Sequence, residues 1–224
     1  MGKIVLATII ISGSAKWLLN VDGNKEKWYG SDRIFMYVMT VFGAMTVNYS
    51  EQCTEYGWVV SNLRLLAGCL LAGGLLSAAY MDRRNCWVYN YVWWWCLPWA
   101  GILGMTAGGE FSGIVAVLVF VMLQQLLFSR MYGKADCHAF SVCALAECGN
   151  AVGMVGFLLQ MFLSVVLLTI VQLFRGNVTP RGRLREPQPF IPYIITAFFS
   201  VTFLESVFRT TYIYAYRVKF LSVE

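Results

Sequence analysis

Eight long apolar runs follow one another along the chain, near residues 4–20, 33–49, 61–81, 87–107, 111–129, 135–149, 151–174 and 190–210. A helix needs about 20 apolar residues to cross the hydrocarbon layer of a membrane. Within lipid the backbone must satisfy its own hydrogen bonds, so each run is expected to be helical. The sequence therefore predicts an all-α, polytopic integral membrane bundle of about eight transmembrane helices, forming a single domain over residues 1–224.

Composition agrees with a membrane protein. Hydrophobic residues make up 58% of the chain and charged residues only 13%, whereas about a quarter of the residues of a soluble domain are charged. The net charge of +5 comes from basic residues in short loops, which favours a topological role and argues against a nucleic-acid partner. The lipid bilayer is the expected partner of most of the surface.

The basic residues predict an orientation. If the eight runs alternate in direction, twelve of the 17 Lys and Arg fall on one side of the membrane. The remaining five fall on the other side: Lys3, Arg64, Arg209, Arg217 and Lys219. The side richer in basic residues is usually cytoplasmic, so both ends of the chain are expected outside the cell (plasma) membrane.

The seven cysteines contain no Cys-x-x-Cys pair. This spacing excludes a zinc ribbon and a thioredoxin-type redox site. Most of these cysteines lie in apolar runs, where a thiol behaves as a small hydrophobic side chain. We expect no metal and no cofactor.

Two aspartates stand at the ends of apolar runs. Asp82 follows the third run and is next to Arg83 and Arg84, and Asp136 opens the sixth run just after Gly133. The chain crosses the membrane twice between them, so both should lie on the same, cytoplasmic face. Ionisable groups at such positions are costly, and they suggest a functional site.

Two neighbouring carboxyl groups can share one proton, because two negative charges a few ångströms apart do not both persist. Such a pair can activate water and protonate a leaving nitrogen, as in an aspartic protease. Two structural interpretations compete with this one. Asp82 with its arginines could be an interfacial charge cluster, and Asp136 could stabilise the start of a helix through the helix dipole.

The motifs around the aspartates resemble those of the type IV prepilin peptidases and archaeal preflagellin peptidases, which are GxGD-type membrane aspartic peptidases. Gly133-Lys134-Ala135-Asp136 resembles the Gly-x-Gly-Asp or Gly-x-Ala-Asp motif of that family. Val88-Tyr89-Asn90 stands where the family has Ile-Pro-Asn, eight positions after the other aspartate, and Pro189-Phe190-Ile191-Pro192 matches a Pro-Phe-x-Pro signature. The resemblance covers residues 63–208, the expected peptidase core.

This resemblance implies an aspartic-type endopeptidase in a prokaryotic membrane. Its substrates would be prepilin-like or pseudopilin precursors of type IV pilus systems, whose short leader it would cleave at the cytoplasmic membrane face. Asp82 and Asp136 would be catalytic, supported by Gly133, Lys134, Ala135 and Asn90. The chain lacks the four-cysteine insertion of family members that also methylate the new N-terminus, so no N-methyltransferase activity is expected.

Smaller expectations concern single residues. Gly133 is expected to allow a tight turn into the sixth run, and Asn90 either orients a carboxylate or caps the fourth helix. His138 should point away from a site containing Asp136, and Glu147 should lie at the membrane interface. Three acidic residues are candidates for recognising a basic leader: Asp22, Glu26 and Glu186.

Two other functions remain open. A proton- or cation-coupled transporter could use the same aspartates, although it would be expected to show repeat symmetry and broken helices, which the sequence lacks. An inactive membrane scaffold of a pilus-assembly machine would also fit. The oligomeric state is not predicted.

Overall fold

The computed structural model describes residues 2–21, 30–52, 57–107, 111–127, 133–148, 153–174 and 188–221. In these ranges the chain forms eight helices and no strands, which confirms the predicted all-α class. Their order is α1 (Gly2–Val21), α2 (Gly30–Gln52), α3 (Trp58–Asn85), α4 (Asn90–Thr106), α5 (Phe111–Leu126), α6 (Lys134–Glu147), α7 (Gly153–Phe174) and α8 (Ile191–Leu221). Each lies over one of the eight predicted runs.

Four of these helices are long and apolar enough to cross a membrane. They are α1, α3, α7 over Met154–Phe174 and α8 over Ile191–Phe208. The length and composition of these four helices are those of a multi-pass membrane protein. α6 has only 14 residues, about 21 Å of helix at 1.5 Å per residue.

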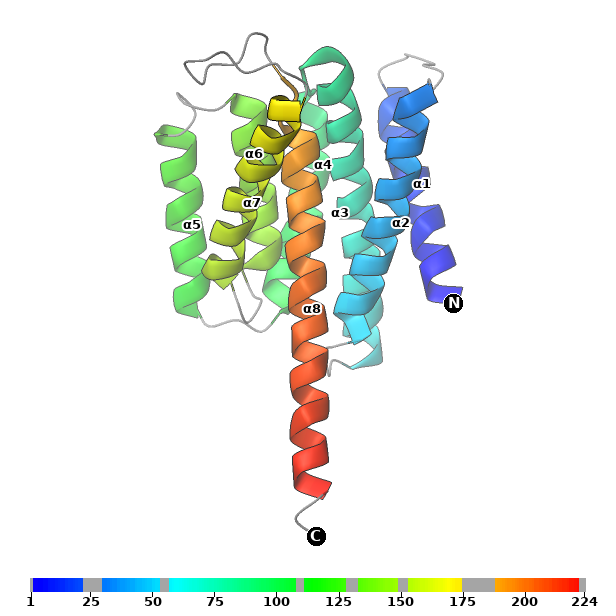
Figure 1. Cartoon of the computed structure of the whole chain (residues 1–224), viewed down its shortest axis with the longest axis vertical. Coiled ribbons are helices and arrows are strands. Elements are labelled where there is room, and N and C mark those ends of the chain that lie inside the picture. Colours follow the sequence, from blue (N-terminus) through cyan, green and yellow to red (C-terminus); the bar gives the residue numbers. More distant parts are fainter. Residues whose placement is uncertain are drawn as a thin grey trace.

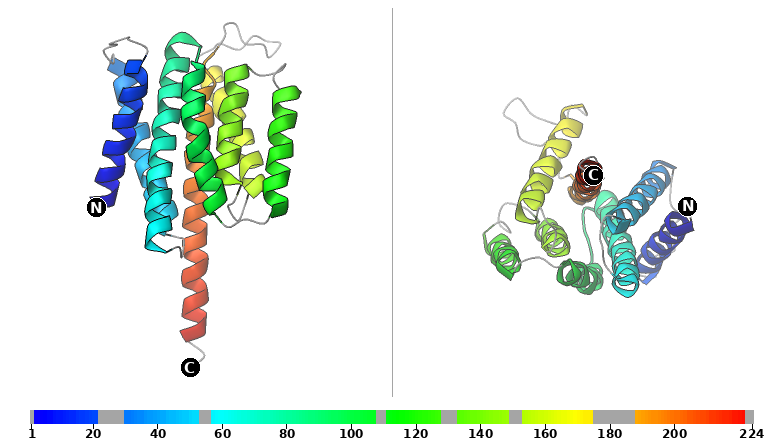
Figure 2. Two further views of the ribbon diagram at one scale, coloured as in Figure 1. Left: turned by 180° about the vertical axis from the view of Figure 1, so that it is seen from behind. Right: turned by 90° about the horizontal axis from the view of Figure 1, so that it is seen from below.

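The helices run up and down side by side, so that α3 ends and α6 begins at the same end of the bundle (Figure 1). Viewed along their axes, α1, α2 and α3 form one group and α5, α6 and α7 another (Figure 2). α4 and α8 lie between the groups, and each packs against both α3 and α6. The two helices that carry the aspartates are thus joined through two shared neighbours.

Most of α3 is buried, because small residues let its neighbours approach closely. A Cβ atom at Gly73 would collide with Ser14 of α1, and one at Gly74 would collide with Cys96 of α4. Helices in lipid gain no hydrophobic driving force against one another, and they associate through such close packing. α3 is therefore the central helix of the first group.

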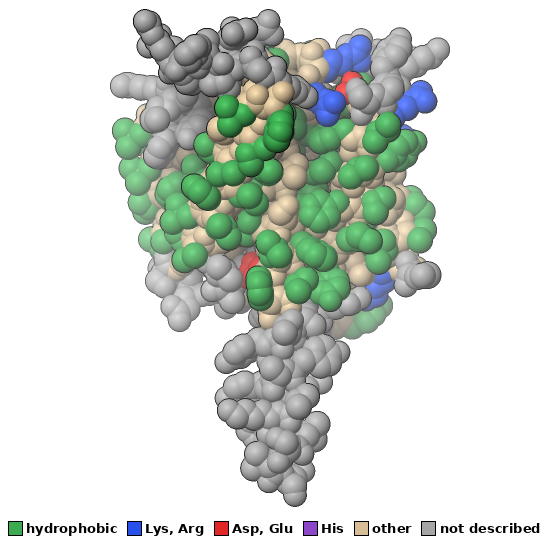
Figure 3. Space-filling view, in the orientation of Figure 1, with side chains coloured by type: hydrophobic (Ala, Val, Ile, Leu, Met, Phe, Trp, Pro, Cys, Tyr) green, Lys and Arg blue, Asp and Glu red, His purple; other side chains and the backbone are tan. Residues whose placement is uncertain are grey.

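Large apolar side chains cover the outside of the bundle (Figure 3). In that view Lys and Arg side chains gather near the end at which α3 finishes. Exposed aromatic side chains lie at both ends of α3: Trp58 is 82% exposed and Trp87 is 64% exposed. Apolar flanks with aromatic and basic residues at the rim are typical of a membrane-embedded bundle.

Candidate active site

Asp82 lies in the last turn of α3 and is only 6% exposed. Its Oδ2 accepts a hydrogen bond from the Ile191 backbone N–H at 2.9 Å. The Phe190 backbone N–H also interacts with this carboxyl group. Ile191 is the first residue of α8, so Asp82 binds one of the amide groups that a helix start leaves without a partner. The Pro-Phe-x-Pro segment therefore places the beginning of α8 on the Asp82 carboxylate.

The chain turns sharply just after Asp82. Cys86 adopts the left-handed conformation (φ 51°, ψ 32°), and its N–H donates to the Asp82 carbonyl oxygen at 2.8 Å. Arg83 is directed toward α2, where its Nε lies 3.0 Å from Asp32 Oδ1 and its guanidinium lies 4.9 Å from the centre of the Phe35 ring. The Arg83 charge thus pairs with a different acid, and Asp82 points into the bundle.

Asp136 is the third residue of α6 and is half-buried. Its Oδ2 accepts a hydrogen bond from the Gly133 N–H at 3.2 Å, and the Cys137 N–H donates to the Gly133 carbonyl oxygen at 3.1 Å. Gly133 has φ −62° and ψ 151°, which any residue adopts. Its small size matters for a different reason: a Cβ there would lie 3.1 Å from Asp136 Oδ2. The tight turn expected at Gly133 is therefore not formed, and its small size instead allows the Asp136 carboxylate to approach closely.

The two aspartates lie at the same end of the bundle, Asp82 in the last turn of α3 and Asp136 in the first turn of α6. A negative charge on Asp82 disfavours a second one on Asp136. Each is also held by backbone amides at a helix N-terminus, α8 for Asp82 and α6 for Asp136. Helix N-termini favour negative charge, while the mutual repulsion disfavours two of them. This arrangement suits a pair that shares one proton.

The supporting residues of the predicted site take different positions. Lys134 is the first residue of α6 and is exposed, while Ala135 is half-buried beside Asp136. The N-cap of α4 is Tyr89, and Asn90 is the first residue inside that helix, with an exposed side chain. The capping role offered for Asn90 is therefore wrong. The three candidates for leader recognition, Asp22, Glu26 and Glu186, lie outside the described residues.

His138 is half-buried on the same helix as Asp136. Its ring lies 6.1 Å from the Trp93 ring, and its Nδ1 lies 3.5 Å from Gln125 Nε2. Gln125 also donates to Ser141 Oγ at 3.0 Å. Polar side chains of α5 and α6 therefore meet in the first two turns of α6, directly after Asp136. Sequence reasoning did not select Gln125; its polar side chain within an apolar run is the signal that could have found it.

Glu147 departs most clearly from expectation. It ends α6 at the opposite end from Asp136, as predicted, but it is buried with only 3% of its surface exposed. It is therefore not an exposed interfacial residue, because α8 packs against α6 and Thr202 of α8 forms a hydrogen bond with its Oε1 at 3.0 Å. Across the described ranges, no three His, Cys, Asp or Glu side chains gather so as to hold a metal ion.

The chain was compared with models of protein families, with curated proteins and with solved structures, and none of them matches.

Proposed function

We propose that this protein is an aspartic-type endopeptidase of the prepilin peptidase kind, with Asp82 and Asp136 as its catalytic residues. The observation that supports it best is the placement of two aspartates, at the end of α3 and at the start of α6, at the same end of a helical bundle. The motif resemblance at Gly133–Asp136 and at Pro189–Pro192 supports it independently. No covalent nucleophile, metal or cofactor is part of the proposal.

The proposed chemistry uses one ionised and one protonated carboxyl group. The ionised group removes a proton from a water molecule as the water oxygen attacks the peptide carbonyl carbon. The protonated group supplies the proton that the leaving nitrogen needs when the C–N bond breaks. One proton enters and one leaves the pair, so the shared-proton state is restored after each turnover. The helix N-termini at both aspartates stabilise the single negative charge that remains.

The proposed substrates are small membrane proteins with a short leader before an apolar helix. Asp82 lies where α3, which is long enough to span a membrane, ends and where α8 begins, which is the depth at which such a leader joins its helix. Exposed Trp87 and Tyr89 border Asp82 in sequence, and aromatic residues favour the membrane–water boundary. The lysine- and arginine-rich side is assigned to the cytoplasm, so cleavage would take place there.

The proposal is tested by co-expressing the full chain with tagged pilin-like precursors and measuring leader removal on gels. Wild type should cleave the leader. The cleavage rates of Asp82→Asn and of Asp136→Asn should each fall at least 100-fold, since loss of a general acid–base group costs about 10²–10⁴ in rate. An asparagine keeps the oxygen that accepts the Ile191 or Gly133 N–H, so the fold should be retained.

Asp32→Asn is the matched control, because Asp32 is an acid at the same end of the bundle that pairs with Arg83. It should cleave at close to the wild-type rate. Cleavage that survives both catalytic substitutions would show that another protease removes the leader. Proton- or cation-dependent transport without cleavage would instead favour the transporter.

A further inference from the structure

Glu147 is a buried acid that the proposed mechanism does not use. It is the last residue of α6 and lies at the opposite end of that helix from Asp136. An ionisable side chain inside a membrane bundle is costly and suggests a function. The hydrogen bonds and charges around its carboxyl group determine which protonation state this site favours.

The site offers an ionised Glu147 few hydrogen-bond donors. Its Oε2 is buried and has no hydrogen-bond partner, and its Oε1 has one, the Thr202 hydroxyl of α8 at 3.0 Å. In the part of the chain that the structure describes, Glu147 forms no ion pair. A carboxylate has about four lone-pair sites. The buried Asp82, by contrast, accepts from a backbone N–H at the start of α8. Glu147 therefore lacks the donors that a buried anion needs.

The Thr202 hydroxyl already has an acceptor. It donates to the Phe198 carbonyl oxygen, one turn earlier in α8, at 2.8 Å. A hydroxyl has one hydrogen and two lone pairs, so with that hydrogen directed at Phe198, Thr202 Oγ1 can only accept from Glu147. Among the forms of a carboxyl group, the protonated one alone has a hydrogen to donate. Both contacts of Thr202 are therefore satisfied together when Glu147 carries a proton.

The charges around Glu147 act in two directions. The last turn of a helix carries partial negative charge on its carbonyl oxygens, and a negative charge on Glu205 of α8 disfavours a second one on Glu147. Cys143, one turn earlier in α6, is buried and also interacts with Glu147. Arg64 of α3 acts in the opposite direction. It lines the same cavity as Glu147, and one of its guanidinium nitrogens donates to two oxygens of α4.

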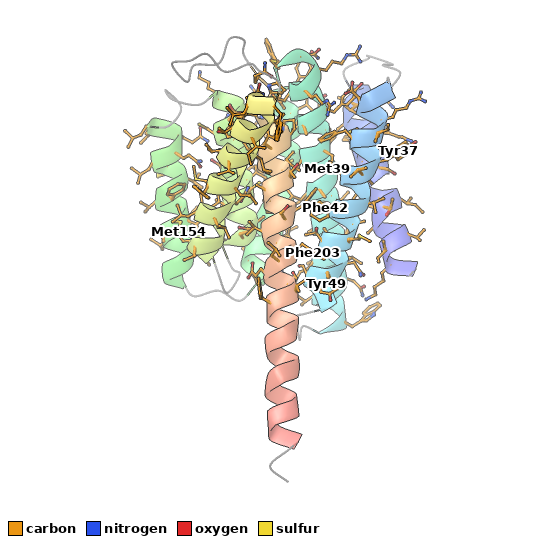
Figure 4. The ribbon with its side chains drawn as sticks, in the orientation of Figure 1. Tyr37, Met39, Phe42, Tyr49, Met154 and Phe203 are labelled. Carbon is orange, nitrogen blue, oxygen red and sulfur yellow. The ribbon has the colours of Figure 1, made fainter. Side chains whose placement is uncertain are left out.

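The surroundings of Glu147 are mainly apolar. The cavity beside it has a volume of about 50 Å³. The apolar residues of its lining include Val47, Leu71, Leu103, Phe198 and Phe199. Phe203, next to Thr202 on α8, lies 6.2 Å from Phe42 and 5.5 Å from Tyr49 of α2, measured between ring centres. These three rings point toward one another between α2 and α8 (Figure 4). A carboxyl group in apolar surroundings takes up a proton rather than remaining ionised.

We propose that Glu147 is a proton-binding site of the folded chain, and that its carboxylic O–H donates to Thr202 Oγ1 and joins α6 to α8. An acid that is kept neutral by an apolar site can serve as a hydrogen-bond donor. The other end of α6 carries Asp136, and α8 begins at the Ile191 N–H that holds Asp82. The proton on Glu147 thus links the two helices that orient the aspartates. The proposal depends only on residues at the opposite end of the bundle, so it is independent of the peptidase.

The pH dependence of unfolding tests for the proton. A glutamate in an unfolded chain is ionised above about pH 5. A folded chain that keeps the proton therefore binds one more, and its stability falls as the pH rises. Between about pH 5 and pH 8, the folded-to-unfolded ratio should fall more steeply for wild type than for Glu147→Gln, by up to about tenfold per pH unit. Equal slopes would mean that Glu147 is ionised in the folded chain, and the proposal would be wrong.

Unfolding of the purified full-length protein is followed with a thiol-reactive dye, since Cys69, Cys96 and Cys143 are buried in the folded chain. Variants are compared with wild type at the same pH.

Asp32→Asn is the matched control for the change of an acid to its amide. Asp32 pairs with Arg83, so it is expected to be ionised in both the folded and the unfolded chain, and its replacement should leave the slope unchanged. Asp82 and Asp136 are present in all three proteins, so their titration cancels in the comparison. A change of slope in Asp32→Asn as large as that in Glu147→Gln would show that the slope does not report a proton on Glu147, and it would contradict the proposal.

Infrared spectroscopy locates the proton. The carbonyl stretch of a protonated carboxyl group is distinct from that of a carboxylate, and carbon-13 labelling of glutamate side chains shifts this band for glutamic acid but not for aspartic acid. At neutral pH the shifted band should be present in wild type and missing from Glu147→Gln. A band that is lost in Glu205→Gln and kept in Glu147→Gln would place the proton on Glu205 and overturn the proposal, as would the absence of any such band in wild type.

Thr202→Val tests the acceptor. Valine has nearly the shape of threonine but no side-chain oxygen, so the Glu147 band should move to the frequency of a carboxyl group without a hydrogen bond. Thr169→Val is the matched control, because Thr169 also donates to a carbonyl oxygen one turn earlier but lies exposed on α7. It should leave the band in place. An unmoved band in Thr202→Val would show that the proton does not join α6 to α8. None of these measurements uses cleavage, so their outcome is separate from that of the peptidase test.

Discussion

At the scale of the residue, Asp82 is held by a helix other than its own. The Ile191 N–H at the start of α8 donates to its carboxylate, much as an N-cap side chain accepts from the first turn of a helix. Asp136 is held by the Gly133 N–H at the start of its own helix. Backbone amides are rigid donors, so both carboxyl groups are oriented without help from flexible side chains. Proton transfer in the proposed pair of carboxyl groups requires such a fixed orientation.

The Ile191 amide provides a test of this orientation. Proline is tolerated at the first position of a helix but has no N–H, so Ile191→Pro should retain α8 and remove the donor to Asp82. A hydrogen bond to a charged group contributes about 1.5–3 kcal/mol. We therefore expect leader cleavage to fall by about tenfold or more.

Ile191→Ala is the matched control, because it also removes the buried Ile191 side chain but keeps the N–H. Cleavage rates of the two variants should be compared at equal unfolding temperatures. If Ile191→Ala loses as much cleavage as Ile191→Pro, the side chain rather than the amide is responsible, and the assigned role of the amide is wrong.

Single residues also show what could be read from the sequence. Asp82 and Asp136 stand out in the sequence because acids at the ends of apolar runs are rare. The chain is expected to cross the membrane twice between them, which predicts that both lie on the same face. The bond from Ile191 to Asp82 joins residues 109 positions apart, and no local pattern encodes such a contact. The sequence does not reveal the burial of Glu147 for the same reason: Thr202, which forms a hydrogen bond with it, lies 55 positions away.

At the scale of the element, close helix contacts position the two groups of helices. α4 packs between α3 and α6, and Gly104 of α4 faces Leu145 and Cys148 at the end of α6. The helices themselves were predictable, because lipid leaves a backbone no alternative to a helix. Their partners were not, since apolar runs of similar composition do not specify which faces meet.

Gly104 tests the contact between α4 and α6. A Cβ at this position would meet the Leu145 carbonyl oxygen and Cys148 Sγ closer than real atoms approach. Forcing atoms into a packed interface costs about 1–3 kcal/mol, so Gly104→Ala should lower the unfolding temperature by roughly 2–10 °C. Thiol-dye unfolding of the purified protein measures the shift.

Gly101 provides the comparison within the same helix. A Cβ there would meet no atom within 4 Å, and alanine is the better helix former by about 1 kcal/mol. Gly101→Ala should leave the unfolding temperature unchanged or raise it slightly. A similar loss for both variants would mean that glycine is needed within α4 itself rather than at its contact with α6.

At the scale of the whole molecule, the direction of the chain decides on which side of the membrane the aspartates lie. α3 runs from exposed Trp58 to the turn at Cys86, and Asp82 is in its last turn. Its 28 residues span about 42 Å, enough to bring its two ends to opposite faces. The distribution of Lys and Arg in the sequence predicts that the Asp82 end faces the cytoplasm.

The two ends of α3 can be probed separately with a membrane-impermeant thiol reagent. Cys86 is exposed, and it can be kept as the only cysteine after the other six of the seven are replaced by alanine. A cysteine-free chain with Trp58→Cys reports on the opposite end. In intact cells Trp58→Cys should react, and Cys86 should react only after the membrane is opened. Labelling of Cys86 in intact cells would place Asp82 and Asp136 outside, where a cytoplasmic leader could not reach them, and the proposed substrate would then be wrong even with the carboxyl pair intact.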